Sequence, residues 1–204
     1  MRIFLCLFLI TAIGCSQSVK FTDKARTGPI VILGDSLAEG YLVEKNEGFI
    51  SVLSERLDIE IVNLGRKGAT TAESLRRVDE EVLSLSPALV LLQLGGNDAL
   101  QKVDPEVTKT NLQTMISQMH KQEIPILLLG VRGGLMSDKL AYAYEDLVSD
   151  NGLAYVSNIL EGILTSPGLR VDNVHPNAKG HILIADRIEP VLKDLVQKLG
   201  LKSK

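Results

Sequence analysis

Three polar residues, one of them far from the other two in the sequence, are of the types that together carry out acyl transfer. Ser36 lies in a Gly-Asp-Ser-Leu turn directly after the apolar run PIVIL, and Asp172 and His175 lie in the late segment DNVHPN. A serine hydroxyl becomes a useful nucleophile when a base accepts its proton, and the pKa of an imidazole suits that task near neutrality. Asp172, three residues before His175, can turn back to the second ring nitrogen and fix its tautomer.

Two further motifs offer hydrogen-bond donors for the oxyanion that such a reaction creates. A glycine loop, 65–68, follows the run IEIVN, and Gly95-Gly96-Asn97-Asp98 follows ALVLLQL. Gly68 lets the backbone approach a ligand closely, and the Asn97 amide carries two N–H donors without charge. Each motif also has a simpler interpretation when taken alone: Ser36 as a helix N-cap, Asp172 and His175 as a polar surface loop, and the Asn97 motif as a turn.

These motifs must be positioned by the elements that precede them. Short runs rich in Val, Ile and Leu are typical of parallel strands buried on both faces, and we expect them at Ile30–Leu33, Glu60–Asn63, Leu89–Gln93, Ile126–Leu129 and Ala154–Val156. Amphipathic stretches between them predict helices at Phe49–Leu57, Thr71–Leu85, from Asp104-Pro105 onward, at Lys139–Val148 and at Ala178–Leu199. Thr70 and Glu73 are placed to form a capping box, and Pro190 is expected to kink or split the last helix.

This alternation predicts an α/β fold: a three-layer α/β/α sandwich with a mostly parallel, five-stranded, flavodoxin-like sheet. Ligands of such sheets bind at the carboxyl ends of the strands, which is where the three upstream motifs lie. The sequence lacks GxGxxG, GxxxxGK[ST] and GxSxG, so it gives no support for a nucleotide site or for the common α/β-hydrolase turn. The two other histidines, His120 and His181, are expected to be structural.

The combination and order of these motifs resemble the SGNH hydrolase (GDSL esterase/lipase) family, in particular its bacterial multifunctional acyl-CoA thioesterase/lysophospholipase branch. The similarity runs from about Pro29 to the C-terminus and is carried by VILGDSLAEGY, LLQLGGNDAL and DNVHPN. It implies a nucleophile (Ser36), a base (His175) and an orienting carboxylate (Asp172). It also implies an oxyanion hole made by the Ser36 and Gly68 amides and the Asn97 side chain. Gly68 fits the family's Asn-to-Gly spacing, with Gly65 as the alternative.

The chain departs from those relatives at two places that bear on substrate. Ala69-Thr70-Thr71 lacks the acidic residue that precedes the Thr in them, and the segment 131–136 is shorter than their acyl-binding loop and lacks its aromatic residue and Asn. Leu135 and Met136 could contact an acyl chain or simply pack in the loop.

The N-terminus has a different composition. Residues 1–14 have a basic start and an apolar stretch too short to span a bilayer, which is typical of a secretory signal. Cys15 follows Ala12-Ile13-Gly14, resembling a lipobox in which that Cys is lipidated. An ordinary signal peptide or a free buried Cys is the alternative. We therefore expect a signal peptide at 1–14, a lipidated tether at 15–28 and a hydrolase domain at 29–204. The protein would be anchored in a bacterial cell envelope, in the periplasm or at the outer membrane.

Composition limits the other functions. The net charge is -3 and the chain has no Trp, which gives no sign of nucleic-acid binding. Cys6 lies in the signal, so the mature chain would have no disulfide and no Cys-based zinc site. The expected function is that of a serine esterase without metal or cofactor, acting on lysophospholipids or short- to medium-chain acyl esters and monomeric. The alternatives are a carbohydrate O-deacetylase and a non-catalytic surface lipoprotein.

Overall fold

The computed structural model describes residues 27–132 and 138–201. A five-stranded sheet lies at its centre in the order β2-β1-β3-β4-β5, and every neighbouring pair is parallel. The strands are β1 (Ile30–Gly34), β2 (Ile61–Asn63), β3 (Leu89–Gln93), β4 (Ile126–Leu129) and β5 (Ala154–Val156). All five were expected from the sequence, with ends that differ by at most one residue.

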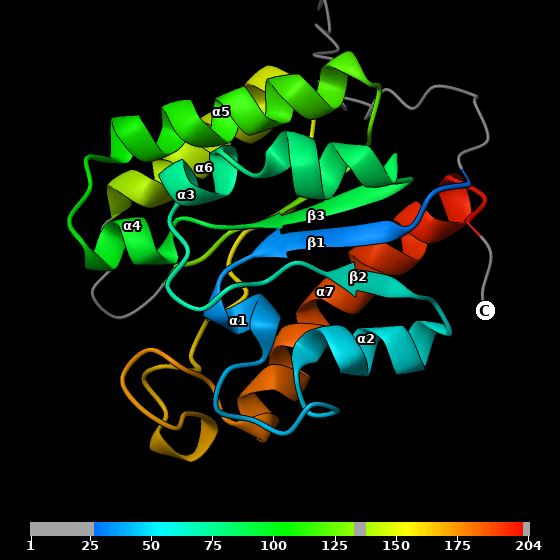
Figure 1. The fold of residues 1–204 in the computed structure, drawn as a ribbon. Coiled ribbons are helices and arrows are strands. Elements are labelled where there is room, and N and C mark those ends of the chain that lie inside the picture. The colour runs from blue at the N-terminus through cyan, green and yellow to red at the C-terminus, as the bar shows by residue number, and fades with distance from the viewer. Residues whose placement is uncertain (1–26, 133–137, 202–204) are drawn as a thin grey trace, which may run out of the picture.

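Helices cover both faces of the sheet, so that the molecule has three layers (Figure 1). Helices α2 (Phe49–Leu57) and α7 (Ala178–Lys198) pack on one face, and α3 (Thr71–Leu75), α5 (Pro105–Lys121) and α6 (Asp138–Asn151) lie on the other. Successive residues of β1 supply the two cores: Ile30 and Ile32 belong to the first, and Val31 and Leu33 to the second. The continuous apolar strands seen in the sequence are therefore explained by burial on both sides.

The predicted helix Thr71–Leu85 is wrong as a single element. It is divided into α3, a π-helical turn at Val78–Val82 and a 3-10 turn at Leu83–Leu85. The break lies at Arg77, whose guanidinium is drawn inward to donate to the carbonyl of Leu64. Val78 and Val82 still reach the core. The capping box of Thr70 and Glu73 is present as expected.

The last helix is not split, because α7 continues through Pro190. Pro190 and Asp186 both lie on the exposed side of the helix. The Asp186 carbonyl, which a proline four residues later cannot bond, therefore faces water rather than the core. Nowhere in the described ranges is there a helix long and apolar enough to cross a membrane.

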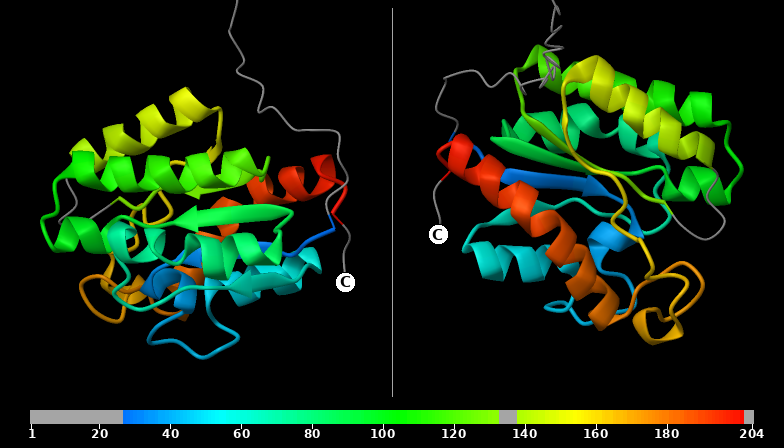
Figure 2. Two further views of the ribbon diagram at one scale, coloured as in Figure 1. Left: turned by 45° about the horizontal axis from the view of Figure 1, so that its top comes forward. Right: turned by 180° about the vertical axis from the view of Figure 1, so that it is seen from behind.

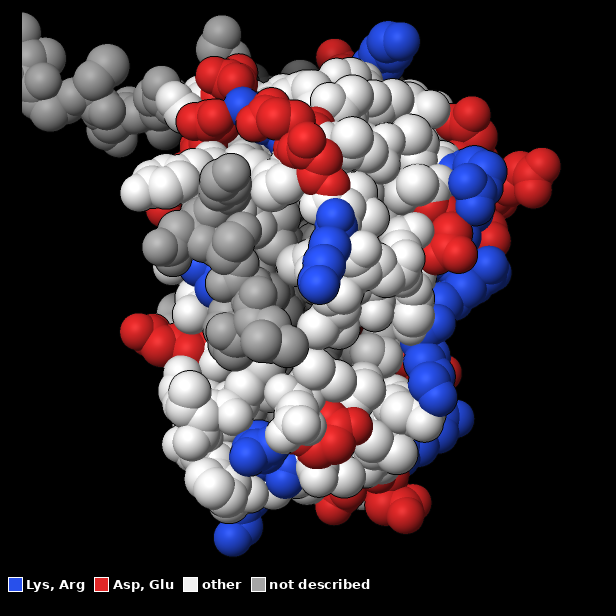
Figure 3. Space-filling model, turned by 90° about the vertical axis from the view of Figure 1, so that its left-hand side faces the viewer, with Lys and Arg blue, Asp and Glu red and all other residues white. Residues whose placement is uncertain are grey.

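The strand order places a binding crevice at the end of the sheet where the strands finish. From β1 the chain crosses to β2 on one side, and the next strand, β3, lies on the other side of β1. Loops that leave β1 and β3 therefore diverge, and such a switch point is where ligands bind in open α/β sheets. Short helices α1 (Ser36–Glu39) and α4 (Gly96–Leu100) begin just beyond these two strands. Figure 3 shows this end of the molecule, with many uncharged side chains near its centre.

Candidate active site

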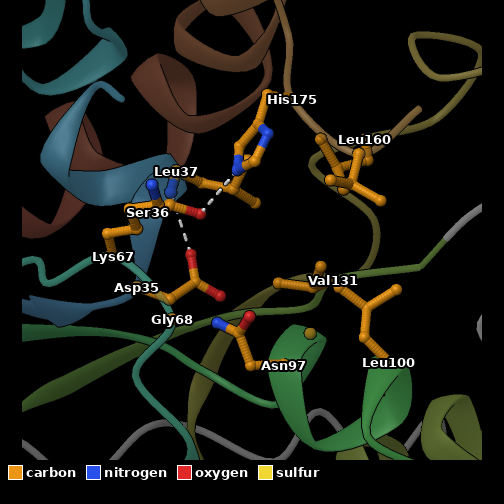
Figure 4. A pocket seen from close by; sticks show the side chains of 12 residues that line it. Asp35, Ser36, Leu37, Lys67, Gly68, Asn97, Leu100, Val131, Leu160 and His175 are labelled. Atoms are coloured by element: carbon orange, nitrogen blue, oxygen red, sulfur yellow. Dashed lines mark hydrogen bonds between the residues drawn. The ribbon is translucent and has the colours of Figure 1, made fainter. Parts of the chain in front are cut away.

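Ser36, His175 and Asp172 come together in a hydrogen-bonded chain, of which Figure 4 shows the contact between Ser36 and His175. The Ser36 hydroxyl lies 3.1 Å from His175 Nε2, and His175 Nδ1 lies 2.8 Å from Asp172 Oδ2. When Nδ1 carries the ring proton and donates a hydrogen bond to the carboxylate, Nε2 is free to accept the proton of the Ser36 hydroxyl. The geometry can therefore deprotonate Ser36 and stabilise the imidazolium that results.

The loop that carries the base is held by its own carboxylate. Asp172 Oδ1 accepts from the backbone amides of Val174 (2.8 Å) and His175 (2.7 Å). Arg170 donates to the Asp172 carbonyl and to Asn173 Oδ1, which closes the loop. Partial burial opposes ionisation of Asp172, but the hydrogen bonds from the His175 ring and the two amides outweigh it and lower its pKa. The carboxylate is thus kept negative beside the imidazole.

Ser36 is the first residue of α1, at a sharp turn from β1. Asp35 is the N-cap: its side chain accepts from the Leu37 amide (2.9 Å) and from the Gln93 amide group (3.1 Å), while its own N–H donates to Gln93 Oε1. Gln93 is fully buried at the end of β3, so the two strands are joined directly beneath Ser36. Burial raises the pKa of Asp35 to about 6, although the hydrogen bonds from Leu37 and Gln93 oppose the rise.

The three expected oxyanion donors surround the same pocket. Ser36, Gly68 and Asn97 all line it. The Ser36 amide is at a helix start and so has no intrahelical partner. Asn97 Nδ2 donates one hydrogen to the Ala69 carbonyl (3.0 Å), which leaves its second N–H for a ligand. Gly68 has a φ of +76°, and a Cβ there would meet no atom within 4 Å, so backbone conformation rather than space favours glycine.

Gly65 is placed differently from Gly68. A Cβ on Gly65 would lie 2.4 Å from the Glu39 amide nitrogen and 2.8 Å from the Ala38 carbonyl carbon. Asn63 accepts from the Gly65 amide through its side-chain oxygen, at 2.9 Å. Gly65 thus serves the contact between its loop and α1 and does not line the pocket, whereas Gly68 does.

A buried carboxylate ties the glycine loop to α4. Asp98, only 1% exposed, accepts from the Thr71 amide at 2.9 Å and also from the Thr71 hydroxyl. Asn111 on α5 donates to the same hydroxyl. Because Gly68 and Asn97 lie on the two segments that Asp98 joins, this network fixes the two donors relative to each other.

The pocket has a volume of about 130 Å³ and an apolar wall. Leu37, Leu100, Val131, Leu160 and Val174 line it beside the polar residues. Arg132 points away from it, toward Glu145 on α6. The remainder of the expected acyl-contacting segment, including Leu135 and Met136, lies outside the described residues, as do the signal sequence and Cys15.

The other two histidines stand apart from this chain of hydrogen bonds. His120 is near the end of α5, and burial lowers its pKa. His181 is fully buried in α7 and accepts a hydrogen bond from the Phe49 amide. Within the described ranges, no group of three or more His, Cys, Asp or Glu side chains is arranged to hold a metal ion.

The GDSL-like lipase/acylhydrolase family model matches residues 32–183. The chain belongs to this family. The matched region includes Ser36, Gly68, Asn97, Asp172 and His175. The resemblance inferred from the motifs is thereby confirmed, and the parallel α/β fold is the one expected of a GDSL hydrolase.

Curated relatives of this GDSL hydrolase are esterases. Esterase TesA of Pseudomonas aeruginosa is 27% identical over 194 residues, covering 90% of this chain and 96% of the relative. The arylesterase of Vibrio mimicus is 29% identical over 181 residues, covering 83% and 89%. Thioesterase 1/protease 1/lysophospholipase L1 of Escherichia coli is 26% identical over 180 residues, covering 84% and 86%. The chain is therefore a serine esterase of the GDSL family.

Solved structures agree with this assignment. The crystal structure of TesA superposes with a TM-score of 0.77 at 26% identity, covering 82% of this chain and 99% of that one. The psychrotrophic esterase EstA from Pseudoalteromonas sp., in a structure inhibited by monoethylphosphonate, gives a TM-score of 0.75 at 25% identity, covering 84% and 100%.

Sequence reasoning missed four residues that shape the site. Asp35 lies inside the serine motif, and Gln93 is a polar residue in an otherwise apolar strand, which is a signal that could have been used. Tyr41 packs edge-to-face against His175, with ring centroids 5.1 Å apart. Lys67 lines the pocket and contacts Tyr41. Neither of the last two gives a sequence signal, because their contacts depend on loops that meet only in the fold.

Proposed function

We propose that this GDSL esterase hydrolyses lysophospholipids or short- to medium-chain acyl esters by a two-step acyl-enzyme mechanism. The observation that carries the proposal is the unbroken chain from Ser36 through His175 to Asp172, in a pocket with an apolar wall. Lysophospholipase is also part of the printed name of the Escherichia coli relative, which supports a lipid-derived substrate here.

Each step has a residue in position. Ser36 attacks the ester carbonyl while His175 takes the hydroxyl proton, and the oxyanion is held by the Ser36 and Gly68 amides and the Asn97 side chain. His175 then gives the proton to the departing alcohol or thiol as the bond to the acyl carbon breaks. Water, deprotonated by the same imidazole, attacks the acyl-enzyme, and release of the acid returns the proton to Ser36.

A carbohydrate O-deacetylase is the second function to consider, because the mechanism is identical and only the acyl group differs. The lining of Leu100, Val131 and Leu160 favours an acyl chain over an acetyl group next to a polar sugar. A non-catalytic surface lipoprotein is disfavoured because every expected polar group of the site is in place.

The proposal is tested by hydrolysis of p-nitrophenyl esters from acetyl to palmitoyl, with the full-length chain beside its Ser36→Ala variant. Activity that peaks at medium or longer chains and disappears in Ser36→Ala is the expected result. Activity confined to the acetyl ester would replace the proposal with deacetylation. Activity that survives in Ser36→Ala would refute the mechanism.

We further propose that residues 1–14 are a signal peptide and that Cys15 is lipidated, which would anchor the enzyme in the cell envelope near lipid-derived substrates. The support is the sequence itself: a short apolar stretch ending in Ala12-Ile13-Gly14-Cys15. An envelope location also argues against acyl-CoA as the natural substrate. Expression in bacteria should place the wild type in the membrane fraction and Cys15→Ser in the soluble fraction, and equal membrane association would contradict lipidation.

A further inference from the structure

Lys67 places a positive charge beside the reacting groups. It lines the pocket with Ser36 and His175, and its ammonium donates to the Tyr41 hydroxyl at 2.7 Å while lying 4.0 Å from the centre of the Tyr41 ring. Tyr41 in turn packs edge-to-face against the His175 imidazole. The ammonium is therefore held one aromatic ring away from the catalytic base, in a contact that stabilises a cation.

Within residues 27–132 and 138–201, no carboxylate forms an ion pair with this ammonium, because none lies within 4.0 Å of Lys67 Nζ. The nearby Glu39 carboxylate accepts from the backbone amide of Lys67 instead, and so fixes the loop rather than neutralising the side chain. The charge of Lys67 thus remains available to a ligand.

The position of Lys67 indicates which part of the substrate it would contact. His175 must protonate the departing oxygen, so the leaving group lies on the side of His175. Tyr41 and Lys67 extend from that side. In Figure 4, Lys67 lies to one side of the Ser36–His175 pair, and Leu160, Val131 and Leu100 lie to the other, where the acyl chain would pack.

We propose that Lys67, held against Tyr41, binds an anionic group on the leaving alcohol, so that the enzyme prefers acyl esters of phosphorylated or carboxylated alcohols over neutral ones. This inference rests on the proposed esterase function and names its substrate class. The interaction is exposed and consequently weakened by salt, and it acts on discrimination between substrates rather than on the chemical step.

Two substrate pairs test the inference, each with one acyl group and alcohols that differ by an anion. The first pair is p-nitrophenyl butyrate and the same ester with a carboxylate on the nitrophenol ring. The second is lauroylglycerol and lauroyl lysophosphatidic acid. The measured quantity is the ratio of kcat/KM for the anionic ester to kcat/KM for the neutral ester, determined with the full-length wild type, Lys67→Met, Lys67→Arg and Lys193→Met.

Lys67→Met should lower this ratio about two- to fivefold, the size expected for an exposed charge contact. Lys67→Arg should keep most of the wild-type ratio. Lys193, exposed on α7 away from the pocket, is the matched control for loss of one positive charge, and Lys193→Met should leave the ratio unchanged. Added salt should move the wild-type ratio toward that of Lys67→Met.

The outcomes separate the two proposals. If Lys67→Met lowers the ratio only in the lipid pair, the anion that Lys67 binds is a phospholipid headgroup. If it lowers the ratio only in the phenyl pair, the anion is a small soluble carboxylate. If Lys67→Met leaves this ratio unchanged in both pairs, the role of Lys67 is overturned and the esterase function stands. An equal fall in kcat/KM for the anionic and neutral esters is such a result. If the wild type hydrolyses no ester, the proposed function fails and this inference fails with it.

Discussion

Two histidines near the C-terminus show how environment decides what one residue type does. His175 lies on a loop at the pocket, with Asp172 on one ring nitrogen and Ser36 on the other. His181 lies within α7, fully buried and stacked beside Phe49, and Nδ1 accepts the Phe49 amide hydrogen. Burial lowers the pKa of His181 to about 4, with a smaller contribution from the nearby His175. His181 is consequently a neutral acceptor that joins two helices.

Two aspartates show the same contrast. Asp172 is half-exposed, and its hydrogen bonds outweigh burial and lower its pKa. Asp35 is buried, and burial raises its pKa to about 6. One carboxylate is thus held ionised to serve the base, and the other is held in the interior to cap α1 and join β1 to β3. Asp172 and His175 thus form part of the proposed catalytic site, whereas the buried Asp35 and His181 hold the scaffold.

The contrast predicts opposite effects of the same substitution at the two histidines. His175→Asn should lower kcat at least about 10³-fold, because no group remains to take the Ser36 proton, and should leave the unfolding free energy within about 1 kcal/mol. His181→Asn should retain most of kcat but destabilise the fold. Esterase kinetics and urea unfolding of both variants check this. Comparable losses of kcat at the two positions would break the distinction.

The contrast was only partly visible in the sequence. The strands were predictable because their apolar runs are buried on both faces, and Ser36, Asn97, Asp172 and His175 were predictable because short motifs carry them. The structural role of His181 was also expected, from its place in an amphipathic pattern. The break at Arg77 in the predicted helix Thr71–Leu85 was not expected, because it depends on a hydrogen bond to the Leu64 carbonyl in another segment.

The missed residues share a physical cause. Asp35 was adjacent to the serine in the sequence, but its burial and its bond to Gln93 arise only when β1 and β3 pair. Tyr41 and Lys67 likewise meet only when the segment after α1 and the glycine loop lie together. Local patterns identify residues that must act through fixed spacing, and they do not identify residues that act through contacts between distant loops.

The raised pKa of Asp35 predicts a pH-dependent difference in stability from Asp35→Asn. The folded protein holds this proton more tightly than the unfolded chain, so its contribution to stability is complete below pH 3.8 and is lost as the pH rises through about 6. Asparagine keeps the capping oxygen and removes the titration. Relative to wild type, Asp35→Asn should therefore be more stable at pH 7 than at pH 4, by at most about 3 kcal/mol.

Urea unfolding of the two proteins at both pH values measures this difference. All other groups titrate in both proteins, so subtraction isolates Asp35. Asn97, which also lies in the pocket but is not a titrating group, offers a control: Asn97→Ala should show the same stability difference from wild type at pH 7 and pH 4. A difference for Asp35→Asn that does not change with pH would show that burial of Asp35 carries no ionisation cost.

The smallest expected effect is at His181, and it separates hydrogen bonding from titration. His181→Leu leaves the buried Phe49 amide without its acceptor, which should cost about 1–3 kcal/mol at pH 7, whereas His181→Asn retains an acceptor oxygen and should cost less.

In the wild type the neutral imidazole contributes stability that is present above pH 6.5 and lost as the pH falls through about 4. Both variants should therefore lose less stability than wild type between pH 6.5 and 4, when urea unfolding is compared across that range. If His181→Leu is as stable as wild type at pH 7, the Phe49 hydrogen bond contributes nothing, and the buried histidine would need another reason to occupy that position.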